Sequence, residues 1–242
     1  MAIHQALITN IFNSPSPMGS LTQLGSGTSI NSSSNSYSID IPVSSVVSTD
    51  LVVIAIVSET STSAAVGDSL NLSFTASNQS VSVTEIVGNM EGTGSSNEHA
   101  RVGIFTVAGS ALSGETTLTF ELELDDSSDN MARIALRAFT IGNATSSNLI
   151  ETKETSTNTS TANMSHTIAM ASGRIGLTAA YFAQGSGHTL SGHSTTYTGV
   201  SNAFGSGDFG SSDDKTSATT ITYTRGSTGN TQGSRMVSAV FG

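Results

Sequence analysis

The chain has 242 residues, of which 11% are charged and 36% are hydrophobic, and its formal net charge is −10. A charged disordered chain is excluded, because Ser, Thr, Gly and Asn rather than ions supply the polar surface. Eight Lys and Arg residues are too few for a phosphate-binding patch, and without cysteine there is neither a disulfide nor thiolate chemistry.

Residues 1–35 form the first predicted element, an N-terminal arm and linker. They are rich in Ser, Gly and Asn and contain Pro15 and Pro17. The arm carries the apolar side chains that we expect to bind a partner: Ile3, Leu7, Ile8, Ile11 and Phe12. A frayed terminus is the alternative. The arm lacks the basic and apolar regions of a secretory signal, so we expect synthesis in a host cytoplasm.

From residue 36 the hydrophobic pattern changes to a period of two, which is typical of half-buried β-strands. "SYSIDIPV" (36–43) places Tyr37, Ile39 and Ile41 on one face, whereas "TDLVVIAIV" (49–57) is apolar on both faces, as in a central covered strand. Further strand patterns occupy 69–76, 80–87, 99–109, 117–125, 132–142, 165–172, 173–184, 216–224 and 234–242. We therefore predict an all-β fold, an antiparallel β-sandwich with jelly-roll topology over residues 36–242. No apolar run approaches the ~20 residues that cross a bilayer, so we expect no membrane insertion.

The charges in 117–141 fit one predicted β-hairpin. If alternate residues of 118–124 face the core and pair with 132–138, then Glu123 lies opposite Arg133 and both point to solvent, as does Arg137. A shift by one residue would bury both arginines, which is costly. We interpret these charges as cross-strand ion pairs rather than as a catalytic site.

Oxygen-rich loops are the candidates for a metal site. The loop with Asp125, Asp126 and Asp129 offers the hard ligands that calcium prefers, but the EF-hand spacing is absent and a solvated turn is the simpler interpretation. A second acidic loop, with Asp208, Asp213 and Asp214, has the same interpretation. "GSGDFG" (205–210) matches dinucleotide and kinase motifs without their strand and helix context, so we expect no cofactor.

Histidine and tyrosine side chains supply the other candidates. His188 and His193 lie close together in the sequence and could bind zinc only with a third ligand. We prefer the interpretation that both lie exposed in a polar loop. Tyr181, Phe182 and Tyr197 are candidate platforms for a sugar, with Phe182 assigned to the core. No pair of residues is singled out for catalysis.

The order of the strand segments resembles that of β-sandwich proteins encoded in phage and prophage structural-gene clusters. The similarity rests on five segments, at residues 50–56, 118–124, 135–142, 173–180 and 234–242, the first with the pattern D-L-V-V-x-A-x. The resemblance covers roughly residues 36–242 and implies a place in the virion, as a head decoration, a head fibre or a tail appendage. It implies no catalytic residue.

Three functions follow as hypotheses. The first is a non-enzymatic capsid decoration or cement protein, which binds other virion proteins of the head lattice through its arm and forms a homo-oligomer, with a trimer favoured. The second is a receptor-binding or carbohydrate-binding tail or fibre head protein, which reads a surface glycan through loops at 88–99, 184–196 and 201–216. The third is a hydrolase on a β-sandwich scaffold.

Overall fold

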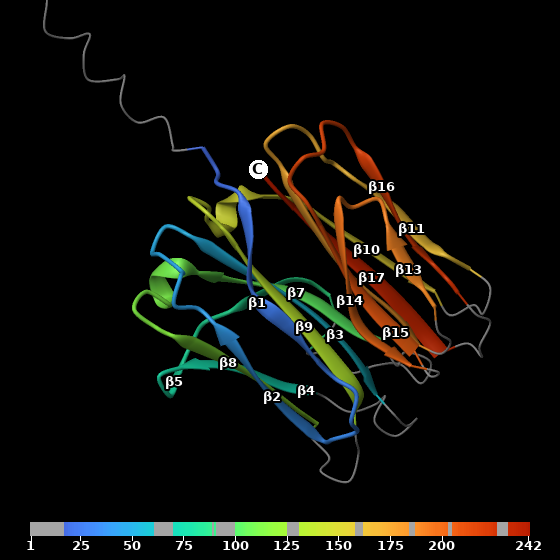
Figure 1. Cartoon of the computed structure of the whole chain (residues 1–242), viewed down its shortest axis with the longest axis horizontal. Helices are drawn as coiled ribbons and strands as arrows, with labels where there is room; N and C mark the ends of the chain where they lie inside the picture. The colour runs from blue at the N-terminus through green and yellow to red at the C-terminus, as the bar shows by residue number, and fades with distance from the viewer. Residues whose placement is uncertain are drawn as a thin grey trace, which may run out of the picture.

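The structure, a computed structural model, describes residues 17–60, 70–88, 90, 100–124, 131–157, 162–183, 187–202, 205–226 and 232–242. These residues form antiparallel strands and two short 3-10 turns, with no α-helix among them (Figure 1). The strands assemble into four sheets that pack face to face. The predicted all-β antiparallel sandwich is therefore confirmed.

The first half of the chain forms two sheets. The first inner sheet has the strand order β1-β9-β3-β7-β6, and the first outer sheet has the order β2-β8-β4-β5. The strands are β1 Leu21–Ile30, β2 Ser36–Pro42, β3 Leu51–Thr60, β4 Leu70–Ala76, β5 Gln79–Ser80, β6 Thr84–Gly88, β7 Ala100–Ala108, β8 Thr117–Leu124 and β9 Met131–Ile141. The two 3-10 turns, η2 Gly109–Ala111 and η3 Ser146–Asn148, follow β7 and β9.

The second half forms the other two sheets. The second inner sheet has the order β10-β17-β12-β15-β14, and the second outer sheet has the order β11-β16-β13. The strands are β10 Leu149–Thr157, β11 Met164–Ile168, β12 Ile175–Ala183, β13 Thr189–Ser191, β14 Thr195–Asn202, β15 Gly205–Ser212, β16 Thr219–Thr224 and β17 Gln232–Phe241.

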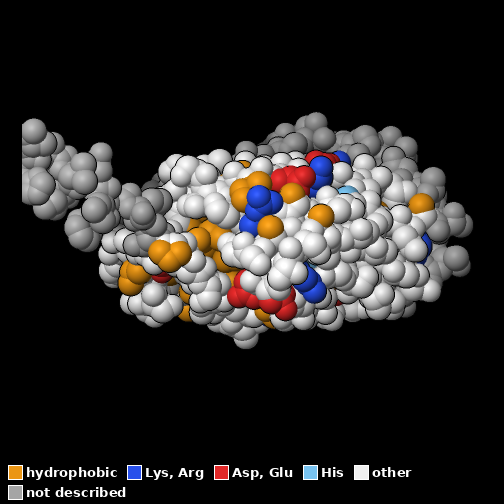
Figure 2. All heavy atoms as spheres, turned by 90° about the horizontal axis from the view of Figure 1, so that it is seen from above, with side chains coloured by type: hydrophobic (Ala, Val, Ile, Leu, Met, Phe, Trp, Pro, Cys, Tyr) orange, Lys and Arg blue, Asp and Glu red, His pale blue; other side chains and the backbone are white. Residues whose placement is uncertain are grey.

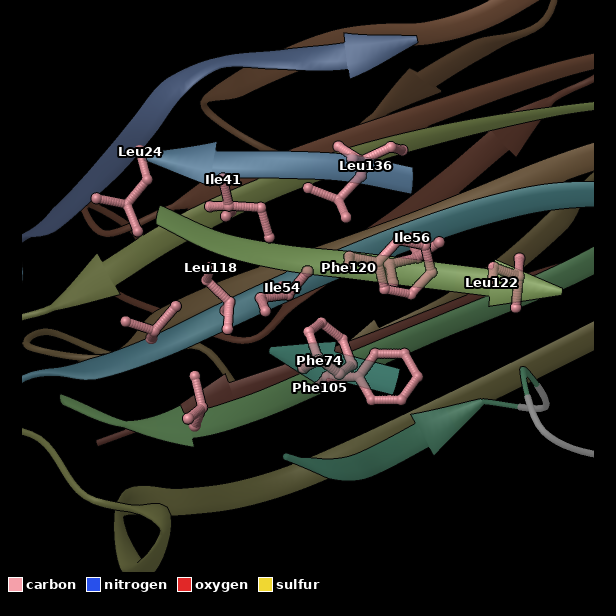
Figure 3. Close-up of a cluster of buried hydrophobic side chains, with 14 of the residues drawn as sticks. Leu24, Ile41, Ile54, Ile56, Phe74, Phe105, Leu118, Phe120, Leu122 and Leu136 are labelled. Carbon is pink, nitrogen blue, oxygen red and sulfur yellow. The ribbon is translucent and has the colours of Figure 1, made fainter. Parts of the chain in front are cut away.

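Three apolar cores separate the four layers. The first lies between the first outer and first inner sheets, where Phe74 packs on Phe105 and Phe120 with ring centroids 5.8 and 5.2 Å apart (Figure 3). The second joins the two inner sheets, and the third lies under the second outer sheet. Strand β3 contributes to both of the first two cores, through Val52 and Ile54 on one face and Val53 on the other. The doubly covered central strand is therefore confirmed.

The two halves repeat one strand order. In the inner sheets β1-β9-β3-β7-β6 corresponds to β10-β17-β12-β15-β14, and in the outer sheets β2-β8-β4 corresponds to β11-β16-β13. Each half is thus a small sandwich, and the two inner sheets pack against each other through the second core. The period-two pattern did not reveal this repeat, because alternation identifies a strand but does not show which strands it pairs with.

The jelly roll predicted for residues 36–242 as one unit is not confirmed. Without β6, the first half places four strands in each of two sheets in an order that resembles a jelly roll, but this covers only β1 to β9. In the second half β14 lies in the inner sheet, and the outer sheet has three strands. The sequence patterns thus indicated the class of fold, whereas the two-part organisation required the structure.

The predicted arm and linker of residues 1–35 are corrected in part. Residues 21–30 are not a linker but the edge strand β1, which pairs with β9 from Leu21 opposite Ile141 to Ile30 opposite Ile134. The pairing is possible because a bulge, with Gly25 and Gly27 at positive φ, interrupts the register. The arm residues Ile3, Leu7, Ile8, Ile11 and Phe12 lie outside the described residues.

The predicted hairpin at 117–141 is wrong, although the inward face of its first strand is right. Leu118, Phe120 and Leu122 are fully buried as expected. However, β8 pairs with β2 and β4, whereas β9 pairs with β1 and β3, so the two strands face each other across the first core. Because β9 is covered on both faces, its other side is largely removed from solvent: Arg133 is 3% exposed and Arg137 is half-buried.

Candidate functional site

Both ends of the described chain lie at one end of the stack, which we call the entry end (Figure 1). The Gly19 amide donates to the carbonyl of Gly142 at 2.6 Å, beside the start of β1. Nearby, the Gly242 amide donates to the carbonyl of Asn148 at 2.8 Å, and the Asn148 side-chain amide donates back to Gly242 at 3.1 Å. Two hollows open among the strand ends at this end of the inner sheets.

The larger hollow is a groove of about 420 Å³, which we call the hydroxyl groove. It is lined by Ser48, Thr49, Asp50, Leu51, Ser82, Thr84, Thr106, Val107, Ala108, Ser110, Ala111, Ala144, Thr145 and Ser146. Asp50 holds one wall of the groove in place through two hydrogen bonds. The Asp50 carboxylate accepts the Val47 amide at 3.0 Å, and the Asp50 carbonyl accepts the Gly109 amide at 2.7 Å. The lining can hydrogen-bond to a neutral ligand that is rich in hydroxyl or amide groups.

The smaller hollow lies where the edges of the two inner sheets meet, and we call it the seam pocket. It has a volume of about 120 Å³ and is lined by Leu21, Gln23, Phe139, Ser194, Thr195, Tyr197, Ser211 and Asp213. Residues of β1 and β9 thus form one wall, and residues of β14, β15 and their neighbouring turns form the other. The pocket exists only because the two halves pack together.

Arg137 holds the Tyr197 ring against the first inner sheet. The guanidinium carbon lies 4.7 Å from the ring centroid, and the Phe139 ring lies 5.9 Å away on the same strand as the arginine. The guanidinium also donates to the carbonyl of Ser26 at 2.5 Å and to that of Thr198 at 3.4 Å. Burial lowers the pKa of Arg137, but an arginine remains charged at any ordinary pH.

A chain of hydrogen bonds runs between the second inner and second outer sheets, and we call it the buried hydroxyl–histidine chain. It begins at Thr155, which lies 3.0 Å from His166 Nδ1, and His166 Nε2 lies 2.7 Å from the Ser238 hydroxyl. Ser238 contacts the Thr178 hydroxyl at 2.6 Å, and Thr178 contacts His193 Nε2 at 2.6 Å. The chain ends where His193 Nδ1 lies 3.0 Å from the Ser212 hydroxyl. Ser212 in turn accepts the Ser194 amide at 2.9 Å. This chain therefore supports the turn that forms one wall of the seam pocket.

Both histidines of the buried hydroxyl–histidine chain are neutral at physiological pH. Burial lowers the pKa of His166 to about 4, and the charge of Lys153 adds to the effect. Burial lowers the pKa of His193 to about 3, with a further contribution from Lys215. Although serine and histidine side chains are in contact here, Ser238 and Thr178 are buried at 0% and 1% exposure, so these hydroxyls support the fold and face no substrate.

A second buried polar group links the two inner sheets through Glu59, Arg133 and Tyr181. The Arg133 Nε atom lies 2.8 Å from a Glu59 carboxylate oxygen, and the Tyr181 hydroxyl donates to the same oxygen at 2.5 Å. Burial raises the pKa of Glu59, against the opposing effects of the arginine charge and the tyrosine hydrogen bond. All three side chains are buried, so the group serves packing.

Of the two histidines predicted to lie exposed in a loop, His188 is buried and His193 is half-buried, which corrects that expectation. His188 packs on the Phe182 ring with centroids 4.7 Å apart, and its Nδ1 accepts the Gly226 amide at 2.9 Å. His193 belongs to the buried hydroxyl–histidine chain. Tyr181 and Phe182 are fully buried and offer no platform, whereas Tyr197 lines the seam pocket.

The acidic loop predicted around residues 208–214 is also corrected. Asp208 lies inside β15 and is buried at 6% exposure, which raises its pKa to about 6. Asp213 and Asp214 follow the strand, and the Ser194 hydroxyl donates to Asp214. The segment "GSGDFGSS" is a buried strand rather than a phosphate loop, and its small residues let the inner sheets approach closely.

The remaining candidates cannot be placed. Asp125, Asp126 and Asp129, the calcium candidates, lie outside the described residues, as do the apolar arm residues. Within the part of the chain that the structure describes, no three His, Cys, Asp or Glu side chains are grouped as metal ligands. No helix among the described residues is long and apolar enough to cross a membrane.

The sequence patterns named no site residue of the hydroxyl groove and only part of the lining of the seam pocket. These walls consist of Ser and Thr residues from turns and strand ends, such as Ser194, Ser211 and Thr145, and hydroxyl residues are too common in this chain to mark a site. Two residues of the seam pocket were named as candidates, Tyr197 as a sugar platform and Asp213 in an acidic loop, and the loops 184–196 and 201–216 that were assigned to glycan reading contain Ser194, Thr195 and Ser211. No protein-family model, curated protein or solved structure matches the chain.

Proposed function

We propose that the chain is a non-enzymatic structural component of a virion, a head decoration or cement protein that attaches to the capsid lattice through its N-terminal arm. The observation that carries this proposal is the place where the arm joins the fold. Strand β1 is an edge strand, and Gly19 is tied to Gly142 at the entry end, so residues before 17 join at the rim of the stack. The arm can therefore contact a neighbouring subunit while the four sheets stay intact.

The outer faces of the stack support a role at an exposed particle surface. On the second outer sheet, Ser165 and Thr222 lie within hydrogen-bond distance at 3.2 Å, as do Thr167 and Thr220 at 3.1 Å. The face in Figure 2 is likewise mostly uncharged polar side chains and backbone, with few Lys, Arg, Asp or Glu residues. Such a surface stays hydrated by its hydroxyl groups at any salt concentration, because charge screening has little to act on.

We assign homo-oligomer formation, with a trimer favoured, to the arm rather than to the sheets. Among the described residues, the large hydrophobic side chains that are exposed are those of Val47, at 55%, and Ile150, at 44%. Stable oligomer interfaces usually have an apolar centre. We assign this apolar centre to the apolar residues of the arm, which would bind both neighbouring copies and the lattice.

Removal of residues 2–16 tests the proposal. Particles made without the protein are mixed with the full chain, with the truncated chain, or with a matched variant in which the five apolar arm residues are serine, and co-sedimentation is measured. We expect binding and trimer formation to be lost in both variants, with the thermal unfolding of the sheets unchanged. Undiminished co-sedimentation of the truncated chain would refute the proposal.

Carbohydrate binding, as in a receptor-reading tail or fibre head protein, is the second candidate. The hydroxyl groove favours it, because the Ser and Thr residues of its lining present neutral donors and acceptors to a ligand of similar chemistry. Binding of the full chain to a glycan array tests it, with Thr84→Val and Ser110→Ala removing two hydroxyls from the lining. A loss of signal in the double variant supports the candidate, whereas an array without signal rejects it.

A further inference from the structure

We propose that the seam pocket binds a single neutral sugar residue, the terminal residue of a glycan, with Tyr197 as its platform and Asp213 and Ser194 as its hydrogen-bonding partners. This inference rests on the second candidate function, carbohydrate binding, and names the place where the identity of the sugar would be read. Neither a motif nor a resemblance points to this pocket. It emerges from the packing of one half of the chain on the other.

The size of the pocket sets the size of the ligand. Its volume of about 120 Å³ lies below the roughly 300–1,000 Å³ of sites that enclose a drug-sized molecule. One sugar ring with one side inserted fits this volume, whereas a drug-sized molecule could not be enclosed in it. The hydroxyl groove, at about 420 Å³, is large enough for more than one residue.

Tyr197 is held in place before any ligand arrives. Arg137 lies over the ring at 4.7 Å, Phe139 packs beside it, and the arginine is itself anchored to the carbonyl groups of Ser26 and Thr198. A fixed aromatic side chain contacts the C–H groups of a sugar without losing conformational freedom, which is the usual advantage of a preorganised site. Tyr197 also presents a hydroxyl group as a polar handle.

The polar side chains favour a ligand that donates hydrogen bonds and carries no negative charge. Asp213 supplies a carboxylate, and the Ser194 hydroxyl, which donates its hydrogen to Asp214, retains lone pairs to accept another. A sugar hydroxyl meets this requirement. A uronic acid, a sialic acid or a phosphate would face the carboxylate of Asp213 and the net charge of −10.

The buried hydroxyl–histidine chain keeps the wall of the pocket in position. Ser212 accepts the Ser194 amide at 2.9 Å and is itself held by His193 at 3.0 Å. Thr195 pairs with Ser211 across β14 and β15, so the rest of this wall belongs to a sheet. Hydrogen bonds therefore hold both walls of the pocket, which suits recognition of one ring shape.

Saturation-transfer NMR with the full chain tests the inference. The probes are the methyl glycosides of glucose, galactose, mannose, rhamnose and N-acetylglucosamine, together with those of glucuronic acid and N-acetylneuraminic acid. We expect saturation transfer to at least one neutral glycoside and at least tenfold weaker binding of the acidic ones. Tyr197→Ala and Asp213→Asn should each reduce the affinity at least tenfold, whereas Tyr197→Phe should retain most of it and Thr84→Val, in the hydroxyl groove, all of it.

The controls separate this inference from the function on which it rests. Asp213 is exposed, so Asp213→Asn remains informative even if Tyr197→Ala unfolds the chain, which thermal unfolding reveals. If the groove variants abolish glycan binding and the Tyr197 and Asp213 variants leave it intact, the seam-pocket proposal is wrong. The carbohydrate-binding candidate would then still stand. A preference for acidic glycosides would also contradict the seam-pocket proposal. Absence of binding in both the glycan array and the NMR experiment would reject the seam-pocket proposal and the carbohydrate-binding candidate together.

Discussion

Arg133 and Glu59 lie opposite each other on β9 and β3, with the arginine Nε atom 2.8 Å from the carboxylate, and both side chains are less than a tenth exposed. Tyr181 reaches the same carboxylate oxygen from the second inner sheet. The Glu59–Arg133–Tyr181 group is thus a polar link within the second apolar core, and Arg137 makes another polar contact between the two halves through the carbonyl of Thr198.

Removal of the arginine should destabilise the fold. Arg133→Met leaves the Glu59 carboxylate buried without its ion-pair partner, and we expect a loss of about 3–5 kcal/mol in the free energy of unfolding, measured with urea at pH 7.5. Lys153→Met is the control, because Lys153 pairs with Glu151 at 2.9 Å but is 43% exposed, and it should cost less than about 1 kcal/mol. Equal losses in the two variants would contradict a buried link.

Acidification should destabilise the protein through His193. The folded-state pKa of about 3 lies below the ordinary value of 6.5, so the unfolded chain binds a proton that the folded chain excludes, and stability falls as the pH drops from 6.5 towards 3. The contribution is about 5 kcal/mol at most. His166 acts in the same direction, because its pKa is also lowered.

His193→Gln tests this dependence, because glutamine keeps an amide near Thr178 and Ser212 but does not titrate. Urea unfolding at pH 7.5 and pH 4.5 should show a smaller loss on acidification in the variant than in the original chain. If both lose the same free energy between these pH values, His193 is not the titrating group.

Asp208 should have the opposite pH dependence. Burial raises its pKa from 3.8 to about 6, so the folded state holds a proton that the unfolded state releases, and the stability contributed below pH 3.8 is lost as the pH rises through 6. Asp208→Asn removes this loss, and we expect the variant to gain up to about 3 kcal/mol relative to the original chain between pH 4 and pH 8. A constant difference across that range, measured by urea unfolding, would show that Asp208 is already ionised at pH 4.

A methyl group on Gly207 should disturb the interface between the inner sheets. A Cβ atom there would lie 2.7 Å from Val57 Cγ2 and 2.8 Å from Tyr181 Cδ2, closer than packed atoms allow. Gly207→Ala should therefore cost about 1–3 kcal/mol, seen as a lower thermal midpoint. Gly142→Ala is the matched control, since its Cβ would meet nothing nearer than 3.6 Å, and comparable losses in the two variants would argue against close packing at β15.

The period-two pattern correctly assigned the core faces of the long strands. Tyr37, Ile39 and Ile41 on β2 are buried, as the alternation predicted. These features are local, because alternation places side chains on a given face whatever the strand pairs with. Strands β10, β14 and β15 were missed because Thr, Ser and Gly residues replace the alternating aliphatic ones there.

Which strands pair, and what covers each face, was decided by the tertiary structure. The alternation in β8 and β9 is the same whether the two strands pair in one hairpin or lie in two sheets that face each other. The sequence alone therefore could not exclude the hairpin. Residues 117–141 showed by themselves that Leu118 and Phe120 point inward. That Arg133 also points inward follows only from the second half of the chain, whose inner sheet covers the face that one sandwich would have left to solvent.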